Sequence, residues 1–491
     1  MPRLSRRDFL AATAAAPLAA AVAPGYGRAA PSPIALRAET RTIEVNGQAA
    51  SMLHIGREDG VSGLYTEVGK RFRVSLENRL KDDQTLIHWH GLTPDYKQDG
   101  VPNVSQPTLD PGGLYDYDFP LTFPGTFWMH SHYELQEQRL MAAPLIIRDP
   151  AEAHLDEQEV VIMLHDFTFR DPDEILAGLK KGESHDKMME EHSDMASSGM
   201  QMSGDAMSGE MSSGGMTMAG MVMDINDIEF DAYLANDRTL DDPEVVRVEP
   251  GGRVRLRIIN AGASTNFQID LGALEGEVIA VDGLAVATVR GKRFPLAMAQ
   301  RLDIRLVLPA GQGAYPVFAQ REDDTARTGI LLATAGAPIK HISGHAMHKA
   351  AIVGLDFEKR LAAADPLPMR PADRLYNIDL TGGMKGYNWS LNGVTAQHHT
   401  PLDLSAGERV EIVFRNKTMM SHPMHLHGHP FQVVEIDGRR FSGAKRDTVM
   451  VPANGAPVTI AFEADNPGHW IMHCHNLYHM AAGMLTSFRY V

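Results

Sequence analysis

Gly69-Lys-Arg-Phe-Arg-Val-Ser-Leu-Glu-Asn78 is the stretch that decides the fold, because the chain repeats it twice more in related form. The other copies are Gly251-Gly-Arg-Val-Arg-Leu-Arg-Ile-Ile-Asn260 and Gly407-Glu-Arg-Val-Glu-Ile-Val-Phe-Arg-Asn416. Each copy has Gly first, Arg third and Asn tenth, with alternating apolar residues between them, the pattern of a half-buried β-strand. The copies start 182 and 156 residues apart, a spacing typical of tandem domains rather than of a solenoid.

The segments around these copies predict an all-β protein. Short alternating stretches are separated by Gly, Pro, Asn and Asp, and helical periods are few. The 491 residues suffice for about three domains of the usual size. We therefore expect three tandem β-sandwich domains: residues 31–150, residues 151–345 with a Met-rich flexible insertion at 183–224, and residues 346–491.

The first 30 residues have the features of an export signal. Ser5-Arg6-Arg7-Asp8-Phe9-Leu10 places two arginines before an Ala-rich, weakly apolar stretch that ends at Ala23. This pattern predicts a twin-arginine (Tat) signal, which is read by a receptor and is not an anchor. The alternative is a disordered Ala-rich tail. With the signal, we expect a periplasmic protein, and we expect no transmembrane anchor because no later stretch has about 20 apolar residues in a row.

The composition excludes some classes and favours metal chemistry. The formal net charge is −16, which argues against nucleic-acid binding, since that requires a basic surface. The single cysteine, Cys474, excludes an intrachain disulfide framework. The chain has 22 His and 27 Met residues, and both side chains are ligands of transition metals.

Four His-x-His pairs predict a metal cluster. On a strand, such a pair points both imidazoles to one face, about 6.6–6.8 Å apart along the chain. Random placement of the histidines gives roughly one such pair, and a single pair fits a half-exposed strand equally well. The four pairs occur in the first and third blocks only: His88/His90, His130/His132, His425/His427 and His473/His475. In the middle block, Gly313–Gln320 corresponds to Gly125–His132 but has no histidine.

A second set of metal ligands surrounds Cys474. The period of two sends its sulfur to the strand face opposite His473 and His475. His479 and Met484 follow at intervals of five residues, and His422 precedes the third histidine pair. One thiolate, two imidazoles and a thioether are the ligands of a blue-copper electron-transfer site. The alternative for Cys474 is a small, inert core residue.

These motifs together resemble those of the multicopper oxidases. The resemblance is carried by His88-Trp-His-Gly91, His130-Ser-His132, His422-Pro-Met-His-Leu-His427 and His473-Cys-His-Asn-Leu-Tyr-His-Met-Ala-Ala-Gly-Met484. It covers essentially the whole chain after the signal. The Met-rich insertion, Gln136-Glu-Gln138 and Thr418-Met-Met420 are most similar to the bacterial copper-resistance branch of that laccase-like family.

The resemblance implies three cupredoxin-like Greek-key domains and four copper ions. It assigns His422, Cys474, His479 and Met484 to a type 1 copper. It assigns His88 and His425 to a type 2 copper. It assigns His90, His130 and His475 to one type 3 copper, and His132, His427 and His473 to the other. The last three ions would form a trinuclear cluster between the first and third domains.

The resemblance also implies an enzyme that oxidises a donor at the type 1 copper and reduces dioxygen to water at the cluster. Cys474, through its neighbours His473 and His475, would pass the electrons. Asp99 aligns with an acidic residue that the family uses in proton delivery, and an Asp-Gly turn is an equally good interpretation of it. Some relatives carry a carboxylate directly after the type 1 histidine, where this chain has Met480, so the proton relay on that side must differ.

Methionines suggest the donor, because soft thioethers suit Cu(I). Met419 and Met420 precede His422, and eleven more fall within 36 residues: Met188, Met189, Met195, Met200, Met202, Met207, Met211, Met216, Met218, Met221 and Met223. We expect these to bind substrate Cu(I), which points to copper tolerance. Small phenolic or aromatic reductants are the alternative donors, with the Met-rich segment as a lid in a laccase-type enzyme. A copper-sequestering periplasmic protein is a further alternative. We expect a monomer.

Overall fold

The recurring sequence forms a β-strand in each of its three copies. These strands are β4 (Arg71–Asn78), β12 (Arg253–Asn260) and β23 (Arg409–Asn416). Each has a parallel partner on one side and an antiparallel partner on the other. In β4 exposed or half-buried residues alternate strictly with buried ones, so one face of the strand packs into the core, as the sequence pattern predicts.

The computed structural model describes residues 32–182, 225–453 and 455–491. Residues Ile34–Val491 form one compact unit. The predicted Tat signal and the Met-rich segment with its eleven methionines lie outside the described residues.

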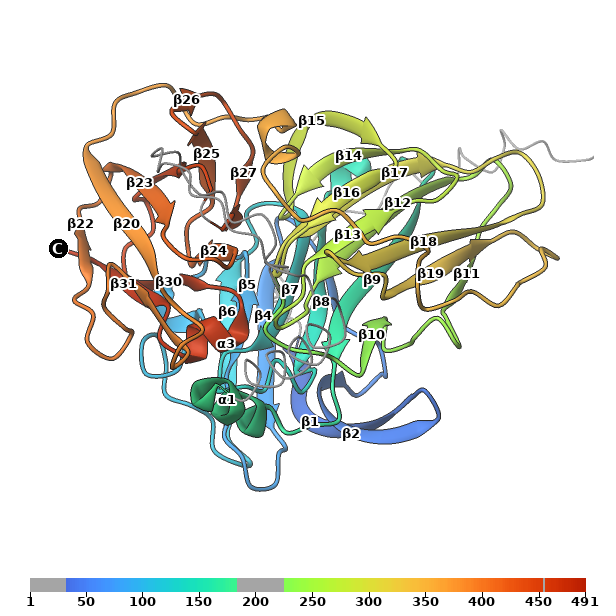
Figure 1. Cartoon of the computed structure of the whole chain (residues 1–491), viewed down its shortest axis with the longest axis horizontal. Coiled ribbons are helices and arrows are strands. Elements are labelled where there is room, and N and C mark those ends of the chain that lie inside the picture. The colour runs from blue at the N-terminus through green and yellow to red at the C-terminus, as the bar shows by residue number, and fades with distance from the viewer. Residues whose placement is uncertain (1–31, 183–224, 454) are drawn as a thin grey trace, which may run out of the picture. The chain divides into compact units, whose positions relative to one another are not determined.

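The strands form six sheets, two around each copy of the recurring sequence (Figure 1). The first pair has the orders β2 (Gln48–Arg57), β1 (Ile34–Val45), β4, β6 (Leu114–Pro120) and β3 (Leu64–Glu67), β8 (Ala142–Arg148), β7 (Gly125–Ser131), β5 (Ile87–His90). The second pair has the orders β10 (Ala232–Ala235), β9 (Gln158–Phe167), β12, β17 (Arg301–Val307), β14 (Gly276–Val281), β15 (Leu284–Gly291) and β11 (Val245–Arg247), β19 (Arg327–Ala333), β18 (Ala314–Arg321), β13 (Phe267–Asp270), β16 (Arg293–Leu296). The third pair has the orders β21 (Asn388–Leu391), β20 (Arg374–Gly383), β23, β29 (Val458–Glu463), β25 (Phe431–Ile436), β26 (Arg439–Arg440), with β27 (Lys445–Arg446) beside β25, and β22 (Leu402–Leu404), β31 (Leu485–Tyr490), β30 (His469–Cys474), β24 (His422–Leu426), β28 (Thr448–Val451).

Helices are a minor part of the described chain. They are α1 (Pro172–Lys181), α3 (Leu477–Ala481) and the 3₁₀ turns Tyr96–Gln98, Pro150–Glu152 and Glu358–Arg360. The predicted all-β class is therefore confirmed.

The three sheet pairs share one connectivity. In each sheet pair, the sheet without the recurring strand begins with two parallel strands and continues with antiparallel ones. The parallel strands are β3 and β8 in the first sheet pair, β11 and β19 in the second, and β22 and β31 in the third. Each pair encloses its own hydrophobic core, and these cores include Trp89, Phe267 and Trp389. The strands of the three pairs lie within 34–148, 158–333 and 374–490. The domain limits given above remain predictions.

The asparagine that ends each recurring strand performs the same task three times. Asn78, Asn260 and Asn416 each accept a hydrogen bond from the backbone N–H two residues later. Their amide groups donate to carbonyls of neighbouring loops, for example from Asn416 to Met420 and Val451. A buried amide with all its partners fixes the chain that leaves the strand. In the first and third sheet pairs, that chain leads into β5 and β24, which carry histidine pairs.

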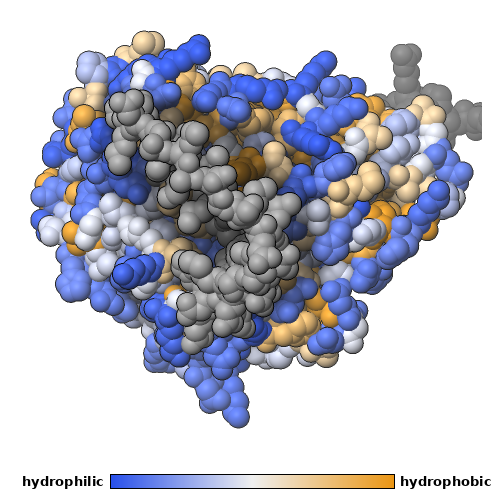
Figure 2. Space-filling view, in the orientation of Figure 1, coloured by the Kyte–Doolittle hydropathy of each residue, from blue (hydrophilic) through white to orange (hydrophobic). Residues whose placement is uncertain are grey.

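No helix among the described residues is long and apolar enough to cross a membrane. The face of the molecule in Figure 2 is mainly hydrophilic outside the grey atoms, and apolar residues lie there in small groups.

Candidate metal centre

The four histidine pairs lie on or directly after two pairs of neighbouring strands. His88 on β5 is opposite His130 on β7, and His425 on β24 is opposite His473 on β30. The second histidine of each motif lies two residues further along the same strand or just after its end. Four imidazoles therefore come from the first sheet pair and four from the third. β5 and β7 approach β24 and β30 near the centre of Figure 1, and contacts between the rings join the two groups.

The eight imidazoles form one buried cluster. His90 stacks on His425 with ring centres 3.8 Å apart, and the rings of His88 and His427 are 3.9 Å apart. The Nε2 atom of His473 lies 3.1 Å from that of His427 and 3.4 Å from that of His132. Several sets of three place their ligand atoms within 4.8 Å of one another: His88, His425 and His427; His88, His90 and His130; and His132, His427 and His473. The cluster that the sequence predicts is thus assembled in space.

Buried carboxylates hold the outer edges of these rings. His427 Nδ1 donates to Asp99 at 2.8 Å, and His88 Nδ1 donates to the Asp99 carbonyl at 2.8 Å. His130 Nδ1 lies 2.7 Å from the Glu137 carboxylate. His90 Nε2 donates to Asp447 at 3.1 Å. Such outer partners fix the orientation and tautomer of histidines that bind metals.

The inner nitrogens lack partners within the described part of the chain. They are His88 Nε2, His90 Nδ1, His130 Nε2, His425 Nε2 and His475 Nε2, all buried. Burial lowers the pKa of six of the eight cluster histidines well below the ordinary value. These six are His90, His130, His132, His425, His427 and His475. Leaving buried polar atoms unsatisfied costs roughly 1–3 kcal/mol each. Neutral, inward-pointing imidazoles are metal ligands, so this donor set fits copper ions.

The predicted blue-copper residues form a second group. Cys474 Sγ lies 3.6 Å from His422 Nδ1 and 3.8 Å from His479 Nδ1, and these two nitrogens are 3.0 Å apart. All three side chains are fully buried. The backbone N–H of Cys474 donates to the carbonyl of Met484 at 3.1 Å, which places the buried Met484 beside the group. Burial raises the pKa of the Cys474 thiol, so a cation is needed to hold a thiolate there.

Both histidines of this second group are fixed from outside. His479 Nε2 donates to the buried Asp227 at 2.8 Å, and Tyr387 also donates to Asp227. Thr418 Oγ1 lies 2.8 Å from His422 Nε2. Each imidazole therefore turns Nδ1 toward Cys474, as a shared metal ion requires.

The remaining predicted residues lie near these groups in different ways. Asp99 contacts the cluster histidines His427 and His88 and precedes Gly100, whose positive φ of 86° makes a turn. The part of Asp99 in proton delivery stays a prediction. Met480, which stands where some relatives have a carboxylate, is half-buried against the core of the third sheet pair. Met420 is buried in that core, whereas Met419 is 56 % exposed.

Sequence reasoning did not identify Glu137, Asp227 and Asp447 as contacts of the candidate ligands. Glu137 stands in a motif that served only to indicate the branch of the family. Asp227 and Asp447 meet histidines 252 and 357 residues away in sequence, and no local pattern marks such contacts.

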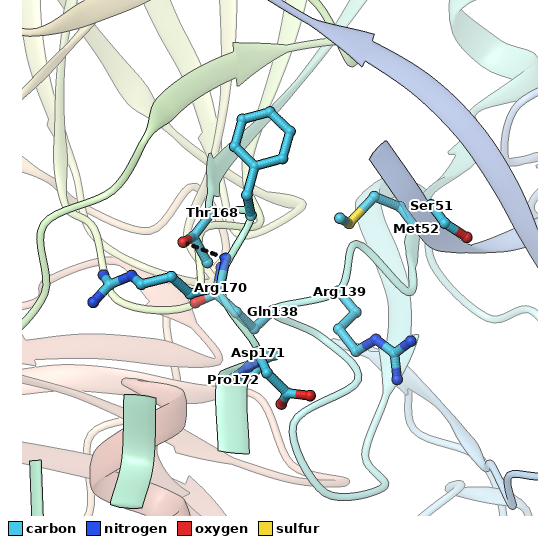
Figure 3. Close-up of a pocket in the computed structure, with 9 residues that line it drawn as sticks. Ser51, Met52, Gln138, Arg139, Thr168, Arg170, Asp171 and Pro172 are labelled. Atoms are coloured by element: carbon cyan, nitrogen blue, oxygen red, sulfur yellow. Dashed lines mark hydrogen bonds between the residues drawn. The ribbon is translucent and has the colours of Figure 1, made fainter. Parts of the chain in front are cut away.

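A surface hollow of about 190 Å³ is formed in part by the loop that follows His132 (Figure 3). Its walls are Ser51, Met52, Gln138, Arg139, Thr168, Phe169, Arg170, Asp171 and Pro172. Gln138 links it to the interior, since its amide donates to Asp166 and accepts from Tyr478, the neighbour of His479. None of the nine wall residues is a candidate ligand, so the hollow is separate from the metal centre.

Comparison with known proteins matches three segments of the chain, residues 37–152, 158–337 and 370–491, to families described as multicopper oxidase. The chain is 33 % identical to the multicopper oxidase MmcO of Mycobacterium tuberculosis over 490 residues, which cover 98 % of this chain and 90 % of that protein. This chain belongs to the multicopper oxidases. The resemblance inferred from the motifs is confirmed, and this multicopper oxidase is a copper-dependent oxidoreductase with dioxygen as its acceptor.

This multicopper oxidase is also similar to a copper resistance protein in sequence and to a laccase in structure. It is 28 % identical to the copper resistance protein A homolog of Pseudomonas syringae pv. tomato, over 91 % of this chain and 90 % of that protein. The solved laccase of Botrytis aclada superposes with a TM-score of 0.72 at 22 % identity, over 93 % of this chain and 88 % of that one. The structural likeness confirms three tandem cupredoxin-like domains as the fold.

Proposed function

We propose that this multicopper oxidase holds four coppers and couples four one-electron oxidations of Cu(I) to the reduction of dioxygen to two waters, in copper tolerance. The observation that carries the proposal is that imidazole nitrogens without a partner among the described residues converge on one buried space, beside a separate Cys-His-His group. His422, Cys474, His479 and Met484 would hold the type 1 ion. His88 and His425 would hold the type 2 ion, with the type 3 ions held by His90, His130 and His475 and by His132, His427 and His473.

Bound copper would supply one-electron storage, since four ions hold the four electrons that dioxygen needs, with four protons, to become two waters. The chain supplies the connection between the two sites. Cys474 faces the type 1 group, and its backbone continues directly into His473 and His475 in the cluster. His473 Nδ1 also donates to the Cys474 carbonyl at 2.9 Å, which adds a short hydrogen-bonded link to the covalent one.

The buried residues around the cluster orient it and exclude water. Trp128 stacks on His130 with ring centres 4.2 Å apart and lies 5.1 Å from the ring of His90. Asp99, Glu137 and Asp447 hold the outer ring nitrogens. An enclosed site of this kind retains dioxygen until its reduction is complete, which fits a four-electron reaction.

Three observations support Cu(I) as the donor. Asp227, which holds the type 1 ligand His479, comes four residues after Met223 at the end of the Met-rich sequence. On the other side of that sequence, Ile175 and Leu179 of α1 pack into the same core as Met484 and Trp389. One described flank therefore contacts a type 1 ligand, and the other packs into the hydrophobic core that contains the type 1 group. The net charge of −16 favours a cationic substrate, and relatives include proteins named for copper resistance.

A laccase-type oxidation of small phenolic or aromatic donors is the second candidate. Laccases are among the relatives, for example laccase-2 of Botryotinia fuckeliana at 24 % identity. In that function the Met-rich sequence would act as a lid rather than a collector. A copper-sequestering protein would bind the same ions without turnover. We also retain, as proposals, Tat-dependent export to the periplasm and a monomeric state.

Metal analysis with a visible spectrum tests the centre. We expect about four coppers per chain and an intense thiolate-to-copper band; about one copper, or no band, would contradict the proposed centre. Dioxygen uptake with Cu(I) then separates an oxidase from a sequestering protein, which would bind copper without consuming dioxygen.

Deletion of residues 188–223 tests the donor. We expect Cu(I) turnover to fall and phenol turnover to stay the same or rise. Unchanged Cu(I) turnover with increased phenol turnover would identify the segment as a lid. Replacing the eleven methionines by leucines at full length is the matched control, because it removes the thioethers and keeps the chain length.

A further inference from the structure

Arg301, at the start of β17, joins all three sheet pairs. It belongs to the middle pair, which carries no histidine in the matching positions. Its side chain is fully buried. Nε donates to the Thr126 carbonyl on β7 of the first sheet pair at 3.0 Å. Nη1 and Nη2 donate to the two oxygens of Asp447, just before β28 of the third, at 2.7 and 2.6 Å.

Every N–H group of the Arg301 guanidinium donates a hydrogen bond. Its other two N–H groups donate to the carbonyls of Ala299 at 3.1 Å and Asp282 at 2.8 Å. All five donors of the planar fork are thus satisfied, which only arginine can do in this geometry. The position of the Asp447 carboxylate is therefore set by a rigid, two-bonded clamp and not by a flexible side chain.

Asp447 carries this constraint to the cluster. The carboxylate oxygen that Nη1 holds also accepts from His90 Nε2 at 3.1 Å and from Thr448 Oγ1 at 3.0 Å. The Asp447 carbonyl accepts from His425 Nδ1 at 2.9 Å. His90 and His425 are the two rings that stack at 3.8 Å. One residue thus holds the outer edges of two facing imidazoles.

His90 differs from its neighbours in the nitrogen that it turns inward. Within the part of the chain that the structure describes, the ring nitrogen without a partner is Nδ1 in His90 but Nε2 in His88, His130, His425 and His475. This reversal follows from the Asp447 contact, because Asp447 engages Nε2 of His90.

Gly91 shows how closely the clamp is packed against the motif. Gly91 has φ +88°, and a Cβ there would lie 2.6 Å from Arg301 Nη2 and 2.7 Å from Asp447 Oδ2. Only glycine can follow His90 at this place. Close packing of Arg301, about 210 residues away along the chain, therefore requires the glycine of the His-x-His-Gly sequence.

We propose that Arg301 is a positioning residue for the trinuclear cluster: it clamps Asp447 so that His90 presents Nδ1, and not Nε2, to the metal. The inference rests on the four-copper centre proposed above. It gives the middle domain a part in the metal site, beyond that of a spacer.

The test compares Arg301→Lys with Arg257→Lys. Lysine keeps the charge but has no fork for two parallel bonds. Arg257 on β12 is a matched control: it is equally buried and also bonds the first sheet pair through Thr126 Oγ1 at 2.9 Å. Its carboxylate partners are Glu159 and Asp303, for which the structure shows no bond to a candidate ligand.

The readout is copper affinity of the reduced protein, measured anaerobically by competition with a Cu(I) chelator, with the type 1 band after reoxidation as an internal reference. Loss of an outer partner lowers metal affinity about 10–100-fold. We expect Arg301→Lys to weaken cluster copper by at least about 10-fold with the type 1 band intact, and Arg257→Lys to weaken neither site.

Three outcomes would overturn the inference: cluster copper unchanged in Arg301→Lys, equal losses in both variants, or loss of the type 1 band together with the cluster. Asp447→Asn, which keeps the shape and weakens the acceptor, must reproduce the selective loss. A wild-type protein that binds no cluster copper would instead refute the proposed function, so the two failures can be told apart.

Discussion

The first and third domains place the same scaffold around two different sets of side chains. Aligned on their histidine pairs, Thr85 stands at the position of His422, Ser131 at that of Cys474, Gln136 at that of His479, and Met141 at that of Met484. The backbone agrees: Ser131 N–H donates to Met141 at 2.9 Å, as Cys474 N–H donates to Met484 at 3.1 Å.

What differs is how the two positions are satisfied. In the first domain, the hydroxyls of Thr85 and Ser131 both donate to Gln136 Oε1 at 2.7 Å, which closes a hydrogen-bonded network. In the third domain, the equivalent atoms face one another at 3.0 to 3.8 Å without such donors. The fold thus provides two equivalent positions, and three side chains decide which of them can hold a metal.

The largest effect should come from making the third domain like the first at one position. Cys474→Ser removes the only thiolate of the chain, so the visible band and dioxygen uptake should both disappear. Because the cluster histidines remain, copper content should fall from about four to about three per chain. Absorption, dioxygen uptake and metal analysis measure this, and a variant that is still blue would refute the type 1 assignment.

The converse change should give the first domain the missing ligands. Thr85→His with Ser131→Cys and Gln136→His would supply two imidazoles and a thiolate beside the buried Met141. We expect a second thiolate-to-copper band in the visible spectrum and one additional copper. Ser131→Cys alone is the control and should add neither, because Thr85 and Gln136 remain. If the triple variant folds with its original copper but gains no band, the two positions are less alike than the backbone indicates.

The smallest effect should come from a buried histidine that belongs to neither metal group. Its contribution to stability shows what burial alone does to an imidazole. His165 on β9 is buried, neither of its ring nitrogens has a partner within the described residues, and burial lowers its pKa to about 4. The folded state disfavours the charged ring, so stability is full above the unfolded pKa of about 6.5 and is lost as pH falls through about 4. Between pH 7 and 4.5 this single group should cost about 2 kcal/mol.

Acid unfolding of His165→Leu measures this contribution. The variant should lose about 2 kcal/mol less than the wild type over that pH range, with its copper content unchanged. Parallel stability curves for the two proteins would show that burial does not keep this imidazole neutral.

The sequence could predict those parts of the molecule that depend on local periodicity. Alternating residues gave the strands, and the period of two placed His473 and His475 on one face with Cys474 on the other. The ligand types could be recognised because copper selects imidazole and sulfur. These predictions need only neighbouring residues in the chain.

Contacts between domains could not be predicted in this way. The bonds from Arg301 to Asp447 and from His479 to Asp227 join residues 146 and 252 apart, and neither pair has a distinctive local pattern. The match of Thr85 and Gln136 to type 1 ligands becomes visible only when the domains are aligned on their histidines. The middle domain contributes through Arg301 and Asp227, neither of which is a copper ligand in the proposed centre.

The division of the cluster between both ends of the chain limits when it can form. Four imidazoles have been synthesised once residue 132 is in place, but the other four wait for residues 425 to 475. A polypeptide that has been synthesised only as far as residue 424 therefore offers incoming metal half of the cluster ligands. Loading of the complete cluster has to wait until His475 has been synthesised, and removal of residues 472–491 would take away His473 and His475, one proposed ligand of each type 3 ion.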